Sequence, residues 1–200
     1  MRPIEYRGSL TREQFLFYET RIVAKMIAVG KTEEEIYEEI IRDNLFQFPT
    51  EKNIRSIATG CYRRLMASEN MELVSIIANG SFEIAKQAAL YALMTYNAVV
   101  YDFMVEVIGE KYKTQDLSFD KSSITRFCSK LRENDESVSG WSDSTMTKIR
   151  SVLLKCLVEA GFLNSTASKE LNPVYLYEEV ANCIHENGDD EVLPAFNCLN

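Results

Sequence analysis

Apolar side chains recur every three or four residues along most of the chain, which is the spacing of an α-helix with one buried face. The pattern predicts helices over residues 11–29, 32–41, 50–66, 71–78, 82–107, 122–133 and 142–160. Gly30 and Gly161 follow two of these segments, and glycine readily ends a helix in the left-handed conformation. Thr32 and Glu35 have the spacing of a capping box, and Thr50 is placed to cap the third helix. We therefore expect a mostly α-helical bundle.

The first three predicted helices have short connections, which is the plan of a helix-turn-helix, and we assign this helix-turn-helix-like part to residues 1–68. The next part, residues 69–115, contains a long segment that is apolar nearly all round. A helix of that kind is buried, so we expect it to be the central element of the fold. We expect it to be kinked near Asn97 and to end at Gly109.

The third part, residues 116–200, begins with a linker at 116–120 and continues with two helices. Two short apolar segments, 162–164 and 171–177, then lie on either side of a polar loop. Helix, strand, loop and strand follow one another in this order in a winged helix, so the pattern indicates a winged-helix-like unit. We expect the remainder to be an acidic tail.

Positive side chains gather on the helix at 50–66, although the whole chain carries a formal net charge of −8. The polar positions of this helix that could contact nucleic acid are Lys52, Asn53, Arg55, Ser56, Thr59, Arg63 and Arg64. Lysine and arginine there could bind phosphates, while the amide and hydroxyl groups could contact sugars or base edges. The alternative is that these cations are solvated and pair with the glutamates of the preceding helix. Spacing alone leaves both interpretations open.

The helix at 142–160 offers a second polar face, formed by Ser144, Thr147, Lys148, Ser151 and Lys155, and we take the first four as candidate DNA contacts. Small hydroxyl side chains and a lysine near a helix start suit a helix that enters the major groove of DNA. The alternative is that the serines only cap the helix, with Asp143 and Glu159 diluting its charge.

Motifs for catalysis or for cofactor binding are missing from the sequence, which has no phosphate-binding loop and no metalloprotease or hydrolase element. We expect no catalytic residue, no cofactor and no metal site, and we expect the one histidine, His185, to be solvated. The five widely spaced cysteines fit a reduced cytoplasmic protein that uses them as small hydrophobic residues. The longest uncharged run, 87–101, is shorter than the roughly 20 residues that cross a bilayer, so we expect no membrane partner.

A series of short patterns, all in one order, resembles the BrxA family of small accessory proteins from BREX bacteriophage-exclusion operons. The patterns are Gly8-Ser9-Leu10 with Glu19, Asn44-Leu45-Phe46-Gln47, Arg63-Arg64-Leu65, residues 102–107 with Glu110-Lys111, Gly140-Trp141-Ser142 with Thr145, and residues 159–163. The resemblance covers roughly residues 8–163.

The resemblance implies a non-enzymatic, largely helical protein that assists phage defence and binds DNA, with a fold likened to the RNA-binding factor NusB. Our leading hypothesis is that the partner is double-stranded DNA. Other BREX proteins are candidate partners. Two alternatives stay open: a protein–protein adaptor within the defence complex, which the net negative charge favours, and a NusB-like RNA-binding protein that uses the same cationic face. The sequence does not define the oligomeric state.

Overall fold

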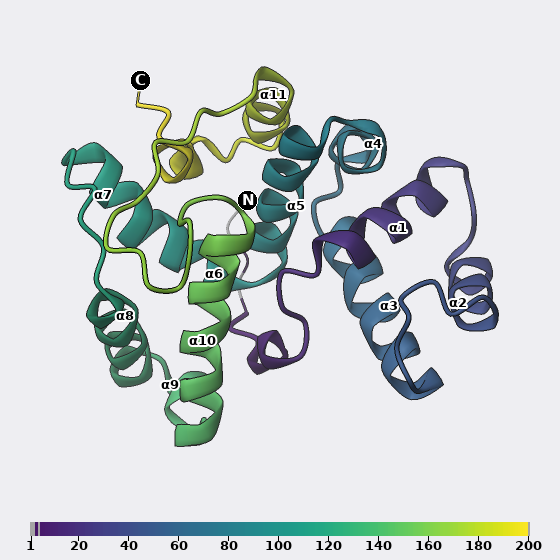
Figure 1. The fold of residues 1–200 in the computed structure, drawn as a ribbon, viewed down its shortest axis with the longest axis horizontal. Helices are drawn as coiled ribbons and strands as arrows, with labels where there is room; N and C mark the ends of the chain where they lie inside the picture. Colours follow the sequence, from purple (N-terminus) through teal and green to yellow (C-terminus); the bar gives the residue numbers. More distant parts are fainter. Residues whose placement is uncertain (1–2, 4, 200) are drawn as a thin grey trace.

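The computed structural model describes residue 3 and residues 5–199, and this part of the chain is mostly helical and contains no β-strand (Figure 1). The α-helices are α1 (Phe17–Ala28), α2 (Glu33–Arg42), α3 (Glu51–Met66), α4 (Met71–Asn79), α5 (Phe82–Tyr96), α6 (Ala98–Phe103), α7 (Glu110–Lys113), α8 (Lys121–Asn134), α9 (Glu136–Ser139), α10 (Asp143–Glu159) and α11 (Glu178–Glu186). Two 3-10 helices, η1 (Gly8–Thr11) and η3 (Asp190–Phe196), and a π-helical stretch, η2 (Met104–Gly109), complete them. The prediction of a mostly α-helical fold is confirmed.

The predicted caps of α2 and α3 are present. Thr32 accepts a hydrogen bond from the backbone N–H of Glu35, whose side chain accepts from the backbone of Thr32, so the capping box is complete. Thr50 accepts from the N–H of Asn53 at the start of α3. These bonds satisfy backbone donors that have no partner inside a helix. Residues 43–50 join the two helices, and because this loop is longer than a helix-turn-helix turn, that description of the N-terminal helices stays a prediction.

The first helix begins six residues later than expected. Leu16 has a left-handed backbone with φ of 50°, which an α-helix of L-residues cannot accommodate in its interior. Residues 12–16 therefore form an irregular segment between η1 and α1, and the expected start at residue 11 is wrong. This segment, called the η1–α1 segment below, lies between α3 and α10 in Figure 1.

The central apolar block is buried and bent, as the sequence predicts. Most of α5 is inaccessible to solvent, and the helical axis turns by 115° at Asn97. The Asn97 side chain caps α6 by accepting from the N–H of Val99, and it donates to the carbonyl of Arg7. The expected end at Gly109 is wrong, because the backbone stays helical to Lys113. Gly109 instead permits close packing, since a Cβ there would lie 3.2 Å from the backbone nitrogen of Ala195.

The two strands expected at 162–164 and 171–177 do not form in the described part of the chain. The only β-bridge there is an antiparallel one between Ser118 and Glu170, so residues after α10 pair with the segment before α8. Asn172 closes the loop by donating from its side chain to the carbonyl of Gly161. The winged-helix expectation is therefore wrong at the level of strands.

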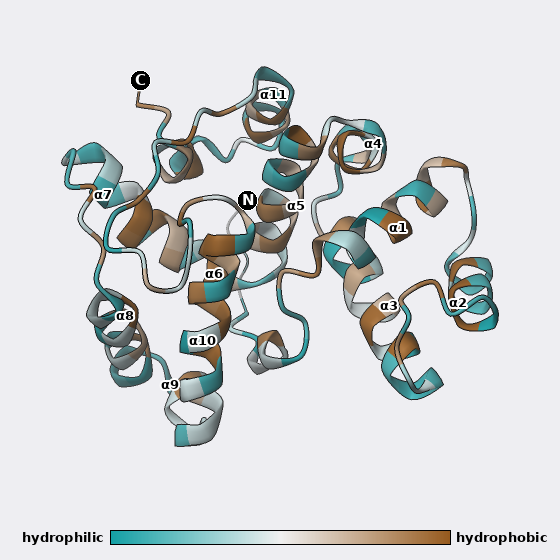
Figure 2. Ribbon diagram, in the orientation of Figure 1, coloured by the Kyte–Doolittle hydropathy of each residue, from teal (hydrophilic) through white to brown (hydrophobic). Residues whose placement is uncertain are grey.

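The expected acidic tail is folded. It forms α11 and η3, whose apolar residues, including Val180, Ile184 and Phe196, are buried in the same cluster as the rest of the core. That cluster extends from Leu10 to Phe196. In Figure 2, α2 is largely hydrophilic, and hydrophobic residues recur along α1 and α3. The division into parts at 1–68, 69–115 and 116–200 stays a prediction.

No single helix in the described residues is both long enough and apolar enough to cross a membrane. The pair formed by Phe82–Tyr96 and Ala98–Lys113 reaches that length and composition only together, across the 115° bend. Residues 85 and 88–96 of the first helix are buried inside the fold.

Candidate nucleic-acid interface

Three of the cations predicted to contact nucleic acid lie exposed on α3. Lys52, Arg55 and Arg63 are accessible to solvent, and none of them takes part in an ion pair within the described part of the chain. The alternative interpretation, in which neighbouring glutamates neutralise them, therefore lacks the close contacts that it requires. Thr59 lies half-buried between them and donates its hydroxyl to the carbonyl of Arg55. We call Lys52, Arg55 and Arg63 the α3 cations.

The fourth predicted cation, Arg64, does not lie on the exposed face of α3, because its side chain is fully buried. Its Nη2 donates to the carbonyls of Glu13 and Gln14, at 2.9 and 2.7 Å, and its Nη1 donates to the carbonyl of Phe15. The expectation that Arg64 contacts DNA is therefore wrong. These bonds satisfy carbonyls that the irregular backbone of the η1–α1 segment leaves without helical partners.

The α10 residues predicted as a second contact set are all exposed. Ser144 exchanges a hydrogen bond with the capping residue Ser142, which supports the interpretation of this serine as part of a helix cap. Ser151 donates to the carbonyl of Thr147, whose own hydroxyl accepts from Arg150. Lys148 makes no hydrogen bond or ion pair in the described part of the chain, so its ammonium group is available to a ligand. The other polar groups of the set are partly occupied.

A groove of about 650 Å³ connects the two predicted sets. Asn53 and Ser56 line it from α3, and Lys148 lines it from α10. The η1–α1 segment lies between these helices and contributes Arg12 and Gln14. We call this cavity the α3–α10 groove; Figure 1 shows the two helices on either side of that segment. The remaining predicted site residues do not line it; they are Lys52, Arg55, Thr59, Arg63, Arg64, Ser144, Thr147 and Ser151.

Both signs of charge line the α3–α10 groove. Arg12 and Lys148 supply positive charge, and Glu19 and Glu159 supply negative charge. Burial raises the pKa of the Glu159 carboxyl above its usual value, and the neighbouring negative charge of Glu19 adds to the rise, while Lys155 opposes it. A ligand that donates hydrogen bonds to these carboxylates would relieve their mutual repulsion.

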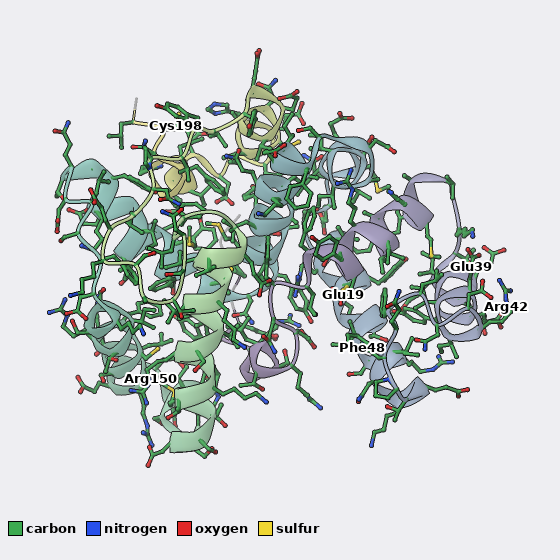
Figure 3. All side chains as sticks on the ribbon, in the orientation of Figure 1. Glu19, Glu39, Arg42, Phe48, Arg150 and Cys198 are labelled. Carbon is green, nitrogen blue, oxygen red and sulfur yellow. The ribbon has the colours of Figure 1, made fainter. Side chains whose placement is uncertain are left out.

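Aromatic side chains form the apolar part of the groove lining, and the sequence analysis did not single them out. Phe17, Tyr18 and Phe48 contribute rings. Figure 3 labels Glu19 and Phe48, which come from α1 and from the loop before α3. The helical period placed residues 11–29 on one continuous helix, and that prediction missed the break at Leu16, just before Phe17 and Tyr18.

Other chemistry is sparse in the described residues. No group of three or more histidine, cysteine, aspartate or glutamate side chains there is arranged to hold a metal ion. His185 pairs through Nδ1 with Asp190 at 2.7 Å on a partly exposed surface. The cysteines are free, and burial raises the pKa of Cys61 to about 11 and that of Cys156 to about 12. Such thiols are protonated and weakly nucleophilic at neutral pH.

The described part of the chain is a small helical protein with exposed cations on one face of α3 and, beside them, a groove lined by aromatic, apolar and charged side chains. A sequence model of the BrxA family matches residues 4–188, and the chain therefore belongs to the BrxA family of the BREX phage-defence systems.

Named BrxA proteins are similar in sequence to this chain along most of their length. The BREX protein BrxA of Bacillus cereus (strain H3081.97) is 29% identical over 92% of this chain and 92% of its own length. The BREX protein BrxA of Escherichia coli O9:H4 (strain HS) is 24% identical over 93% of this chain and 87% of its own length. A crystal structure of an uncharacterized protein from Magnetospirillum magneticum has the same fold, with a TM-score of 0.81 at 22% identity over 97% of this chain and 99% of that one.

Proposed function

We propose that this BrxA-family protein is a non-enzymatic component of a BREX phage-defence system that binds double-stranded DNA in the cytoplasm. The observation that carries the proposal is the exposure of the α3 cations without carboxylate partners. Lysine and arginine side chains that are free to reach phosphates supply most of the affinity of a protein for DNA, through the release of counterions.

The overall charge of −8 does not prevent this contact, because charge acts locally in salt solution. The Debye length at physiological ionic strength is about 8 Å, so carboxylates on distant faces are screened. Lys148 on α10 adds a fourth free cation beside the α3–α10 groove. Four phosphate contacts then hold the duplex against α3, and Asn53 and Ser56 are placed to contact sugars or base edges.

Charge reversal at the centre of the α3 cations tests the proposal. Arg55→Glu should weaken the binding of a 20-base-pair duplex at least about tenfold in fluorescence anisotropy, because it removes one phosphate contact and adds a repulsive charge. Lys113→Glu is the matched control, since Lys113 is exposed at the end of α7 and lies outside both contact sets. Equal affinities for the Arg55→Glu and Lys113→Glu variants would place the DNA contact elsewhere.

The same titration with single-stranded RNA and double-stranded RNA distinguishes the NusB-like, RNA-binding alternative from duplex DNA binding. Preference for RNA, with the same loss in Arg55→Glu, would assign the α3 cations to RNA instead of DNA. Absence of binding to any of these nucleic acids at low salt would favour an adaptor that contacts other BREX proteins. The net charge of −8 and the acidic α2 are the features that support the adaptor.

A further inference from the structure

We infer that the α3–α10 groove binds a nucleotide unit, either a free nucleotide or a nucleotide exposed in a single strand. The groove volume of about 650 Å³ lies within the range of roughly 300–1,000 Å³ that is typical of small-ligand pockets. A duplex is too large to enter such a cavity, so the inference adds a ligand inside the groove to the duplex contact proposed along the α3 cations. Asn53, Ser56 and Lys148 line the groove and belong to both proposals, whereas Tyr18 belongs to the nucleotide site alone.

An exposed aromatic ring at the groove is held in place for stacking. Tyr18 is 67% exposed, whereas its neighbour Phe17 is buried. Its ring meets Phe17 edge-on at 5.4 Å between centroids, and it lies 6.5 Å from the ring of Phe82. A ring positioned by two neighbours offers a face to a base with little loss of side-chain freedom. Phe48 supplies a further ring to the groove lining.

Unused amide groups provide the means to recognise a base edge. The side chains of Asn53 and Gln14 line the groove and make no hydrogen bond within the described part of the chain. An amide has both donors and an acceptor, and it can form paired bonds with a purine. Ser56 adds a hydroxyl without a partner in the same part of the chain.

The two signs of charge in the groove match the two ends of a nucleotide. Lys148 and Glu159 lie eleven residues apart on α10, which corresponds to about 16 Å along the helix. A phosphate fits beside Lys148 and Arg12, and an exocyclic amino group can donate to Glu159 or Glu19. A simple anion would be repelled by the two carboxylates, and a simple cation would be repelled by Lys148 and Arg12. A ligand with a phosphate at one end and a hydrogen-bond donor at the other matches both.

Calorimetric titration of the full chain with AMP, adenosine, TMP and a five-residue deoxyadenosine strand tests this inference. Wild-type protein should bind AMP or the strand saturably, AMP more tightly than adenosine because of the phosphate, and AMP more tightly than TMP because TMP lacks an exocyclic amino group. Saturation by AMP identifies a free nucleotide as the source, and saturation by the strand alone identifies single-stranded nucleic acid. Both results support the inference.

Variants connect that binding to the groove. Tyr18→Ala should weaken the bound probe at least about fivefold, which is the lower end of the effect of losing an aromatic stacking partner. Tyr175→Ala is the matched control, because Tyr175 is exposed and lies outside the groove. Lys148→Ala should weaken AMP and leave adenosine unchanged.

Duplex binding in the Tyr18→Ala variant should equal that of wild type, so the inference and the proposed function can fail separately. Two results would overturn the inference: no saturable binding of AMP or of the strand at millimolar concentration, or equal losses in the Tyr18→Ala and Tyr175→Ala variants.

Discussion

Arg63 and Arg64 are neighbours in the sequence, and the fold places them in opposite environments: Arg63 is exposed, whereas Arg64 is fully buried. Successive residues of an α-helix point about 100° apart, so adjacent side chains need not share a face. Arg64 turns toward the η1–α1 segment and donates to the carbonyls of Glu13, Gln14 and Phe15. One arginine is therefore available to a ligand, and the other holds the groove wall in place.

Alanine substitution should separate these two roles. Arg64→Ala should lower the free energy of unfolding by about 3–5 kcal/mol, because three backbone carbonyls lose their partner and a cavity remains. Arg63→Ala should change it by no more than about 0.5 kcal/mol, since it removes an exposed side chain without partners. Urea denaturation followed by circular dichroism measures both values. Similar losses of stability in the two variants would contradict the assignment of Arg64 to the fold.

Acidification should weaken the capping box of α2. Backbone and side-chain hydrogen bonds from Thr32 hold the pKa of the Glu35 carboxyl below its ordinary value of 4.5. Because the folded-state pKa is lower than the unfolded one, this carboxylate stabilises the protein above about pH 4.5, and the contribution is lost as the pH falls further. Glu35→Gln keeps a hydrogen-bonding side chain that does not titrate, so its stability should depend less steeply on pH between 6 and 3.

Urea denaturation at several pH values measures that dependence. Glu34→Gln is the control, because it removes a neighbouring exposed carboxylate that is outside the capping box. A pH dependence in the Glu35→Gln variant as steep as in the Glu34→Gln variant would argue against the role of the capping box.

A buried hydroxyl joins the C-terminal part of the chain to the central helices. The Tyr101 hydroxyl on α6 lies 2.7 Å from the Asp189 carboxylate and 2.5 Å from the Glu191 carboxylate, so its single proton is shared between the two acceptors. Burial together with these two carboxylates raises the pKa of Tyr101 far above its ordinary value. Tyr101→Phe should lower the free energy of unfolding by about 1.5–3 kcal/mol, the usual range for hydrogen bonds to charged groups. Tyr175→Phe removes an exposed hydroxyl and should have almost no effect; equal losses would contradict the anchoring role of Tyr101.

Sequence patterns predicted the regular parts of the fold because their determinants are local. A threonine followed three residues later by glutamate defined the start of α2, and Gly30 and Gly161 mark chain reversals with left-handed backbone. The bend at Asn97 was also predictable, since an asparagine interrupts an apolar helix there. Each of these features depends on residues within one or two helical turns.

Features that depend on distant partners were not predictable from the sequence. Residues 12–16 are not helical, and Arg64, about fifty positions later in the sequence, donates hydrogen bonds to backbone carbonyls of this segment. The same contact buries an arginine that spacing alone placed with the α3 cations. The segment taken as an acidic tail is folded because its apolar residues reach the central helices, which their separation in sequence concealed.

Of the candidate site, the sequence predicted the exposed cations and the two helices, and it did not predict the groove between them. Asn53 and Ser56 lie about ninety residues before Lys148 in the sequence, and all three line one cavity because the η1–α1 segment lies between α3 and α10. Arg12 and Tyr18 belong to that segment or to the helix start that follows it, so they were not singled out.

The salt dependence of duplex binding tests the central claim most directly. Each neutralised phosphate contributes about −0.9 to the slope of log K against log salt, so four contacts, from the α3 cations and Lys148, predict a slope of about −3 to −4. The Arg55→Ala/Arg63→Ala double variant should retain its fold and show a slope of about −2. A slope that is the same in wild type and double variant, or a duplex that does not bind at low salt, would contradict the claim that the α3 cations contact DNA.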